Sequence, residues 1–291
     1  MAANLHISIS AEPITAIGDF ALTNSMFTSL LVSGMLIAFA LAVRLSLTNT
    51  NKPQGLQNFA EWIIEALHNL IYSTTGDLKK TRLFLPIISS FFLFIILNNW
   101  LGLLPGVGTI TVPLYESADH LEEQSTVVNT KEDIHELSDT EEPFTYPQAE
   151  VAETTDSHVP QVPVLRPGSA DLNTTLALAV ISVFMTQVFG VQFQHLGYFK
   201  KFINFSSPIM FFVGILELVS EFAKIISFAF RLFGNIFAGE VLLVVISALI
   251  PLVAPMPFYG LELFVGFIQA LVFSMLSLVF FNMATQSHDS H

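Results

Sequence analysis

Long apolar runs separated by short polar stretches dominate this chain. The runs at 26–47, 82–104 and 171–195 each approach or exceed the roughly 20 residues that a helix needs to cross a bilayer. Two longer stretches, at 206–250 and 258–286, are also almost entirely apolar. The pattern predicts an all-α integral membrane protein with about five membrane-crossing helices.

The segment 53–76 has a different pattern. Leu56, Phe59, Ile63 and Leu67 recur at helical spacing, with acidic and amide residues between them. An amphipathic helix of this kind lies in a membrane interface or forms a soluble linker. Its position between two predicted spans favours an interfacial amphipathic helix.

Composition supports a membrane protein and explains the charge. Hydrophobic residues make up 52% of the chain and charged residues 12%, about half the usual share for soluble proteins. Residues 113–165 hold 13 of the 24 acidic residues and a single basic residue, Lys131. We expect 105–170 to be an acidic outer loop, largely disordered over 113–165, with 1–25 as an outer lead and 287–291 as a tail.

The basic residues predict the orientation of the chain. Seven of them fall on one side if every span crosses the membrane: Arg44, Lys52, Lys79, Lys80, Arg82, Lys200 and Lys201. Positive residues favour the cytoplasmic side of a membrane. We therefore expect the N-terminus and the acidic loop outside and the C-terminus in the cytoplasm. No basic patch indicates binding to nucleic acid.

Six charged residues lie inside the last two apolar stretches: Glu217, Glu221, Lys224, Arg231, Glu240 and Glu262. A charge at the bilayer centre costs about 2.5–3.5 kcal/mol on insertion scales, so each residue needs a partner, water or a surface position. Ionisable residues within a membrane are functional candidates for this reason. The alternative for Glu217, Glu221 and Lys224 is a structural ion-pair row.

Helical phase divides these residues. At 100° per residue, Glu221, Lys224 and Arg231 fall within about 40° of the direction of Glu217. Glu240 follows Arg231 by nine positions and points about 180° away from it. The phase predicts a polar stripe that ends near Arg231 and a separate acidic site toward the outer end.

Neighbouring polar residues extend both sites. Asn235 returns to the direction of Glu217, Ser227 lies on the flank of the stripe, and Glu262 and Gln269 share a face of the final helix. Asn235 and Gln269 could instead serve only as hydrogen-bonding contacts between helices. The layout suits two half-paths for an ion, an outer one through Glu240 and Glu262 and a cytoplasmic one past Asn235 and Glu217.

Arg231 lies between the two half-paths. Arginine is effectively always protonated in proteins, so it cannot relay a proton. It can repel cations and attract a passing carboxylate. The position predicts a barrier to direct leakage and a transient partner for an anion.

The stretch that carries Arg231 is unusually long. About 42 residues separate Pro208 from Pro251, which corresponds to roughly 63 Å of helix against a hydrocarbon core of about 30 Å. An unbroken, strongly tilted helix and two short helices broken at Gly234–Asn235 fit the pattern equally well.

Familiar catalytic motifs are missing from the sequence. We find no Walker A loop, nucleophile elbow, zinc motif or metal-ligand spacing of histidines, and the chain has no cysteine. We therefore expect no nucleotide site, no metal and no cofactor in this chain, so that any part it has in an enzyme is as a non-catalytic, ion-translocating subunit.

The segment Phe228–Glu240, FAFRLFGNIFAGE, resembles the Arg-Leu-Phe-Gly-Asn-x-x-Ala-Gly-Glu signature of subunit a of the F-type ATP synthase membrane sector, in its bacterial type. Shorter segments at 17–25, 98–105, 170–177 and 268–270 also resemble that family. The resemblance covers nearly the whole chain outside 113–165.

This resemblance implies a stator beside a rotating ring of c subunits, with two long, strongly tilted C-terminal helices forming a hairpin. Arg231 matches the arginine that meets each ring carboxylate. The matching half-channel positions are Glu217, Ser227, Asn235, Glu240 and Gln269. Glu262 falls where members carry His or Glu, and it would pair with Glu240. Lys224 matches a common lysine, although Ile225 stands where many members have proline.

The function implied is proton translocation through two half-channels to and from the c-ring, coupled to ring rotation and ATP synthesis. The implied partners are the c-ring subunits, the peripheral-stalk b subunits and membrane lipids, in a bacterial inner membrane. One alternative is a secondary ion transporter with a helix broken at Gly234–Asn235. The other is a membrane assembly scaffold that transports nothing.

Overall fold

A computed structural model of the protein describes residues 10–17, 20–47, 55–104, 111–113, 161–195, 197–198, 202, 207–250 and 253–286. The expectations for the first nine residues, for most of the acidic loop and for the tail at 287–291 lie outside the described residues.

The described elements are, in chain order, β1 (Pro13–Ile17), β2 (Phe20–Thr23), α1 (Asn24–Ser46), α2 (Leu56–Thr75), α3 (Leu78–Gly102), β3 (Thr111–Pro113), β4 (Gln161–Pro163), the short 3-10 helix η2 (Gly168–Ala170), α5 (Leu172–Gln194), α6 (Pro208–Leu249) and α7 (Pro255–Ala284). Five of these helices, all except α2, are long and apolar enough to cross a membrane. The prediction of an all-α membrane protein is confirmed.

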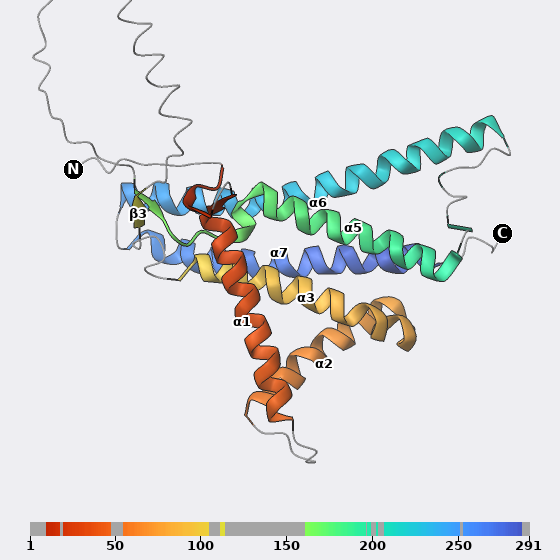
Figure 1. The fold of residues 1–291 in the computed structure, drawn as a ribbon, viewed down its shortest axis with the longest axis horizontal. Coiled ribbons are helices and arrows are strands. Elements are labelled where there is room, and N and C mark those ends of the chain that lie inside the picture. The colour runs from red at the N-terminus through yellow and green to blue at the C-terminus, as the bar shows by residue number, and fades with distance from the viewer. Residues whose placement is uncertain are drawn as a thin grey trace, which may run out of the picture.

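Four helices form the body of the molecule. α3, α5, α6 and α7 run alongside one another, and α1 crosses them steeply near one end (Figure 1). That end also carries the small sheets β1–β2 and β3–β4. At the opposite end α6 separates from α5 (Figure 1). Within this chain, therefore, the first half of α6 is covered on fewer sides than the second.

α6 is continuous. It runs for 42 residues from Pro208 to Leu249, about 63 Å of helix, without interruption at Gly234–Asn235. Pro208 occupies the first turn, where its missing N–H costs no helical hydrogen bond. The two-helix alternative left open by the sequence is therefore wrong.

Side-chain caps explain where several helices begin. Asp77 precedes α3, and its carboxylate accepts a hydrogen bond from the Lys79 backbone N–H at 2.8 Å. Such a cap satisfies one of the unpaired N–H groups of the first turn. α3 therefore begins at Leu78, four residues before the expected 82. α7 also begins earlier than the expected 258, because Pro255 suits the first turn of a helix.

α2 connects the far end of α1 with the start of α3 (Figure 1). Its buried residues include Ala60, Leu67 and Ile71, spaced as one face of a helix. It ends at Gly76, whose φ of 64° is a left-handed conformation that glycine adopts without strain. The helix is amphipathic, as the spacing of apolar residues indicates.

Aromatic side chains fill the centre of the helix bundle. Phe84 of α3, Phe189 of α5 and Phe281 of α7 pack as a triad with ring centroids 4.9–5.6 Å apart. Phe228 of α6 packs on Phe273 of α7 at 5.2 Å. Helices in a bilayer gain little from excluding water, so close packing of this kind holds them together.

The two small sheets and η2 were not predicted from the sequence. β1 pairs antiparallel with β2, and β3 with β4, through strands of only three to five residues. A side-chain carbon on Gly168 of η2 would overlap Ser29 of α1 and Asn98 of α3. Strands this short give almost no periodic signal, and the close approach at Gly168 depends on tertiary contacts.

We predict that Phe84→Ala destabilises the protein strongly, because it leaves a cavity among three helices. A Phe→Ala change in a core costs about 3–5 kcal/mol, which corresponds to a thermal midpoint lower by about 5–15 °C. Thermal unfolding of the detergent-solubilised complex measures the change. Phe264→Ala is the matched control, because Phe264 is 61% exposed. Equal losses in the two variants would contradict the packing described here.

Candidate functional site

Arg231 lies on a face of α6 that no other described part of the chain covers. Ser227, Gly234 and Ala238 share this exposed face. Arg231 lies in an apolar stretch of the sequence, but in the described part of this chain its side chain is exposed. Among the described residues, Arg231 has no hydrogen bond or ion pair. The guanidinium is therefore available to a group from outside the chain.

An amide pair joins α6 to α7 close to Arg231. Asn235 donates from Nδ2 to Oε1 of Gln269 at 2.6 Å. Gln269 is 4% exposed, and its Nε2 has no hydrogen-bond partner among the described residues. The predicted residues Asn235 and Gln269 are thus in contact, with one buried donor left unpaired.

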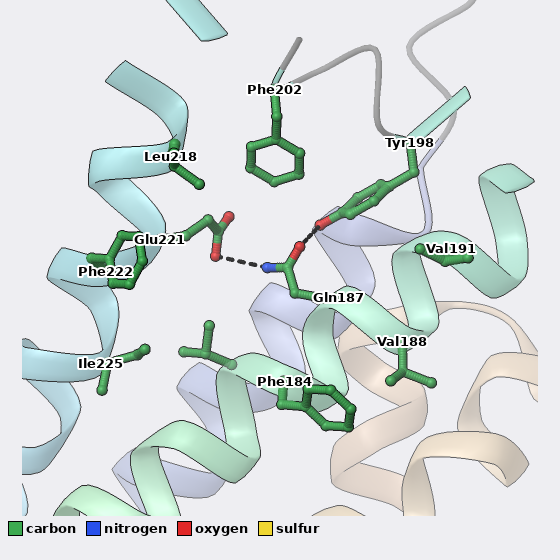
Figure 2. Close-up of a pocket in the computed structure, with 11 residues that line it drawn as sticks. Phe184, Gln187, Val188, Val191, Tyr198, Phe202, Leu218, Glu221, Phe222 and Ile225 are labelled. Carbon is green, nitrogen blue, oxygen red and sulfur yellow. Dashed lines mark hydrogen bonds between the residues drawn. The ribbon is translucent and has the colours of Figure 1, made fainter. Parts of the chain in front are cut away.

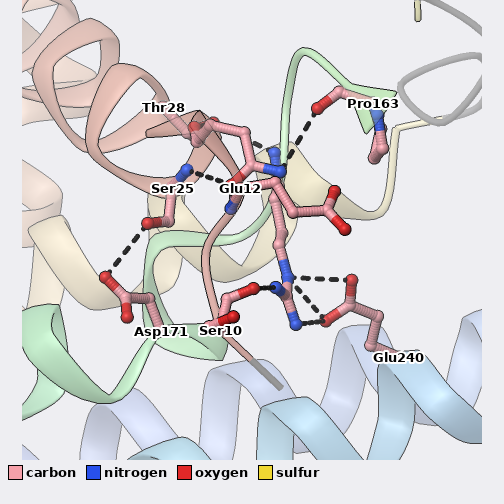
Figure 3. A network of polar contacts seen from close by, with 9 residues as sticks. Ser10, Glu12, Ser25, Thr28, Pro163, Asp171 and Glu240 are labelled. Atoms are coloured by element: carbon pink, nitrogen blue, oxygen red, sulfur yellow. Dashed lines mark hydrogen bonds and ion pairs between the residues drawn. The ribbon is translucent and has the colours of Figure 1, made fainter. Parts of the chain in front are cut away.

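Glu240 forms a polar site toward the end of α6, paired with Arg166 (Figure 3). Arg166 donates from Nε and Nη2 to Oε2 of Glu240 at 3.2 and 3.1 Å, and its Nε lies 3.1 Å from Oε1. The side chains of Arg166 and Glu240 are 5% and 30% exposed. A forked guanidinium–carboxylate contact of this kind fixes both groups in orientation.

Arg166 is itself held by the N-terminal part of the chain. Its Nη1 donates to the backbone carbonyl of Ser10 at 2.9 Å, and its backbone N–H donates to Oγ1 of Thr28 at 3.2 Å. Nearby, Ser25 donates to Asp171 at 3.0 Å (Figure 3). These contacts tie the segment before η2 to α1 and place Arg166 over α6.

Glu262 lies against α6 without touching an ionic partner. A side-chain carbon on Gly239 would overlap its carboxylate, so glycine at 239 makes room for it. Glu262 is 6% exposed and has no hydrogen bond or ion pair among the described residues. The sequence resemblance implied a Glu240–Glu262 pair. The structure pairs Glu240 with Arg166 instead, because a guanidinium within reach neutralises a buried carboxylate and a second carboxylate does not.

Glu221 anchors a second polar site, toward the start of α6. Lys224 donates from Nζ to its Oε1 at 2.8 Å, and Gln187 of α5 donates from Nε2 to its Oε2 at 3.1 Å. Tyr198, in the segment after α5, donates from its hydroxyl to Oε1 of Gln187 at 2.8 Å (Figure 2). Lys224 also lies over the ring of Phe280, 4.8 Å from its centroid.

A pocket of about 630 Å³ opens beside this site, between α5, α6 and the segment that carries Tyr198 and Phe202 (Figure 2). Its walls are largely apolar side chains, and its polar lining residues are Gln187, Glu221 and Tyr198. These three are the side chains linked by hydrogen bonds in Figure 2.

Glu217 and Ser227 flank Glu221. Glu217, one turn earlier on α6, is half-buried, and Ser227 is exposed.

Burial raises the pKa of Tyr198 to about 12, and the nearby carboxylates of Glu221 and Glu217 contribute. A phenol with that pKa stays protonated at all physiological pH values, so Tyr198 remains available as a hydrogen-bond donor.

Three residues of these sites were missed by sequence reasoning: Arg166, Gln187 and Tyr198. Arg166 carried a signal, because it is a basic residue on the predicted outer side, next to the acidic segment. Gln187 and Tyr198 carried none, since Gln187 is one of several amides in its span and a tyrosine just after a span is common. Their role depends on how α5 packs on α6.

The two polar sites lie on either side of Arg231. Glu221 precedes it by ten residues and Glu240 follows it by nine, about 15 and 14 Å along the helix. Among the described residues no three His, Cys, Asp or Glu side chains gather as metal ligands would. The arrangement suits transfer of charge through side chains.

Known proteins match this chain over nearly the whole stretch from the first helix to the last. A family model described as ATP synthase A chain matches residues 26–282. The ATP synthase subunit a of Gloeobacter violaceus is 31% identical over 259 residues, which cover 88% of this chain and 83% of that protein. The chloroplastic ATP synthase subunit a of Stigeoclonium helveticum is 29% identical over 263 residues, covering 90% and 85%.

We predict that Arg166→Leu destabilises the outer end, because Glu240 then stays in a low-dielectric position without its cation. Breaking a fully buried pair costs about 3–5 kcal/mol. Glu240 is 30% exposed, so we expect about 1–3 kcal/mol here and a thermal midpoint lower by several degrees.

Adding Glu240→Gln to Arg166→Leu should recover part of this loss, because no uncompensated charge remains. Thermal unfolding of the purified complex for the two single variants and the double variant gives the coupling. If the two losses add in full, the contact between Arg166 and Glu240 contributes nothing to stability.

Proposed function

This chain belongs to the ATP synthase subunit a family, and we propose that within it Arg231 separates two proton half-channels. As a member of that family it is a multi-pass membrane protein and the stator subunit of the Fo sector, where it takes part in proton translocation. Its work is done within a complex that contains other subunits. The observation that carries the proposal is the exposed Arg231 between two internally paired polar sites.

The face around Arg231 suits contact with a ring of c subunits. Ala223, Ser227, Gly234 and Ala238 repeat along it at helical spacing and are all exposed. Nothing lies within 4 Å of a side-chain carbon built on Gly234. Small residues let another helix approach closely in a membrane. A carboxylate on such a helix would come within reach of the Arg231 guanidinium as the ring turns.

The outer half-channel runs from Glu240 and Glu262 toward the amide pair of Asn235 and Gln269. The unpaired Nε2 of Gln269 and the free carboxylate of Glu262 support it, because both can take part in a hydrogen-bonded path with water. Protons that enter here would reach a ring carboxylate on the outer side of Arg231.

The cytoplasmic half-channel runs past Glu217 and Ser227, with Glu221 and Lys224 at its wall. Glu217 and Ser227 lie on α6 before Arg231, and their side chains are half-buried and exposed, respectively. A proton released from a ring carboxylate on this side would leave toward the cytoplasm. Because Arg231 keeps its charge, a proton cannot pass directly between the two half-channels.

The separation matters because the membrane potential acts on every translocated charge. One elementary charge crossing 100 mV corresponds to about 2.3 kcal/mol. A direct path would dissipate this free energy, whereas a path interrupted at Arg231 makes the ring turn before the proton can leave. Ring rotation and ATP synthesis are coupled to proton flow in this way.

We place the N-terminus outside and the C-terminus in the cytoplasm of a bacterial inner membrane, with peripheral-stalk b subunits and lipids around the remaining faces. Arg44, Lys79 and Arg82 all lie at the cytoplasmic end of this arrangement, as the distribution of basic residues favours.

The continuous α6 removes the broken helix on which the transporter alternative rested. A pure scaffold would not need an exposed guanidinium between two polar sites.

We predict that Arg231→Ala abolishes coupled ATP synthesis and ATP-driven proton pumping, because nothing then holds the ring carboxylate or blocks leakage. Inverted membrane vesicles with a fluorescent pH probe measure pumping, and passive proton permeability should rise. Arg44→Ala is the control, an exposed arginine at the end of α1 that should leave both activities intact. Retained pumping in Arg231→Ala would sink the mechanism.

A further inference from the structure

A chain of three hydrogen-bonded side chains ends on Glu221. The Tyr198 hydroxyl donates to the Gln187 amide oxygen, and the Gln187 amide nitrogen donates to the Glu221 carboxylate (Figure 2). We propose that Tyr198 and Gln187 are positioning residues: the Tyr198 hydroxyl fixes which way the Gln187 amide points, and the amide holds the Glu221 carboxylate in place. Only the consequence for proton release rests on the proposed function of the cytoplasmic half-channel.

The direction of these two hydrogen bonds follows from which groups can donate and which can only accept. An ionised carboxylate only accepts hydrogen bonds, so the Gln187 NH2 must face Glu221. The Gln187 oxygen then faces Tyr198, which must donate. A protonated Glu221 would instead donate to the amide oxygen, and a turned amide would donate to the Tyr198 oxygen. The amide orientation and the state of Glu221 are therefore linked through the phenol.

The fold holds Tyr198 in place for this contact. Its side chain is 2% exposed, and a methyl group on Gly190 of α5 would overlap its ring. Gly190 lies one turn after Gln187 on the same helix, so the ring rests on α5 beside the amide. Phe202 packs edge-on against Tyr198 with ring centroids 5.6 Å apart. The Tyr198 hydroxyl can therefore reach Gln187 with little freedom to turn elsewhere.

Each oxygen of the Glu221 carboxylate accepts a hydrogen bond from a different side chain. Lys224 occupies one carboxylate oxygen at 2.8 Å, and Gln187 occupies the other at 3.1 Å. Glu217 is the neighbouring acid on the same helix. If the Gln187 amide is not held in this orientation, the Glu221 carboxylate loses one of these two contacts and keeps the one with Lys224. The lost donor lies beside an apolar pocket. A carboxylate that loses a hydrogen-bond donor is less favoured in its ionised form.

The test uses Tyr198→Phe in the assembled complex, which keeps the ring packed on Gly190 and removes only the hydroxyl. Infrared difference spectroscopy, with Glu221→Gln to assign the band, follows the protonated carboxyl of Glu221 against pH. We expect its titration to move up by about 0.5–1 pH unit, the effect of one lost hydrogen bond. The pH profile of pumping in inverted vesicles should move in the same direction.

Two comparisons make the result decisive. Tyr259→Phe is the matched control, because Tyr259 is 42% exposed and has no hydrogen bond among the described residues. Gln187→Leu should shift the titration like Tyr198→Phe, and the double variant should shift it no further. A titration that moves no more than in the control, or single shifts that add in the double variant, would overturn the proposal.

The two readouts separate this inference from the proposed function. An infrared shift with an unchanged pumping profile would support the positioning of Glu221 and contradict its place at the wall of the proton path. Unchanged spectra in Tyr198→Phe would contradict the positioning itself, whatever happens to pumping.

Discussion

The cost of a charge in hydrocarbon governs how α6 is built. Glu221 is neutralised by Lys224 on the same helix, and Glu240 by Arg166 from the segment before α5. Arg231, between them, has no such partner among the described residues. The helix therefore carries a cation without a partner on a face that the described residues leave uncovered. We propose that a carboxylate on a helix of another subunit is this partner.

Because α6 is continuous, the separations of Glu221, Arg231 and Glu240 along it are fixed. Glu221 and Glu240 are 19 residues apart, about 28 Å of unbroken helix, which is close to the thickness of the hydrocarbon core. The two paired sites therefore keep a fixed distance along the helix, with Arg231 about midway between them. A break at Gly234 would have allowed the outer site to move independently of Arg231. A continuous helix keeps both at a fixed separation.

Much of this could be predicted from local sequence. Apolar runs and helical phase predicted the helices and put Glu240 on the opposite side of α6 from Arg231, because both follow from a fixed rotation per residue. Helix ends were less predictable, since Asp77 and Pro255 act through caps and first-turn geometry. The partner of Glu240 could not be predicted at all. Arg166 is 74 residues away in the sequence, and only the packing of η2 on α1 brings it over α6.

The central claim is that the exposed face around Arg231 is the face that meets the ring of c subunits. The chain contains no cysteine, so a single introduced thiol reports on one position of this subunit. Ser227→Cys lies one turn before Arg231 on that face, whereas Ala229→Cys lies on the buried face. Oxidative cross-linking to a cysteine beside the ring carboxylate requires Cα atoms within about 7 Å. The account predicts a disulfide from Ser227→Cys and none from Ala229→Cys. Cross-linking from Ala229→Cys alone would contradict it.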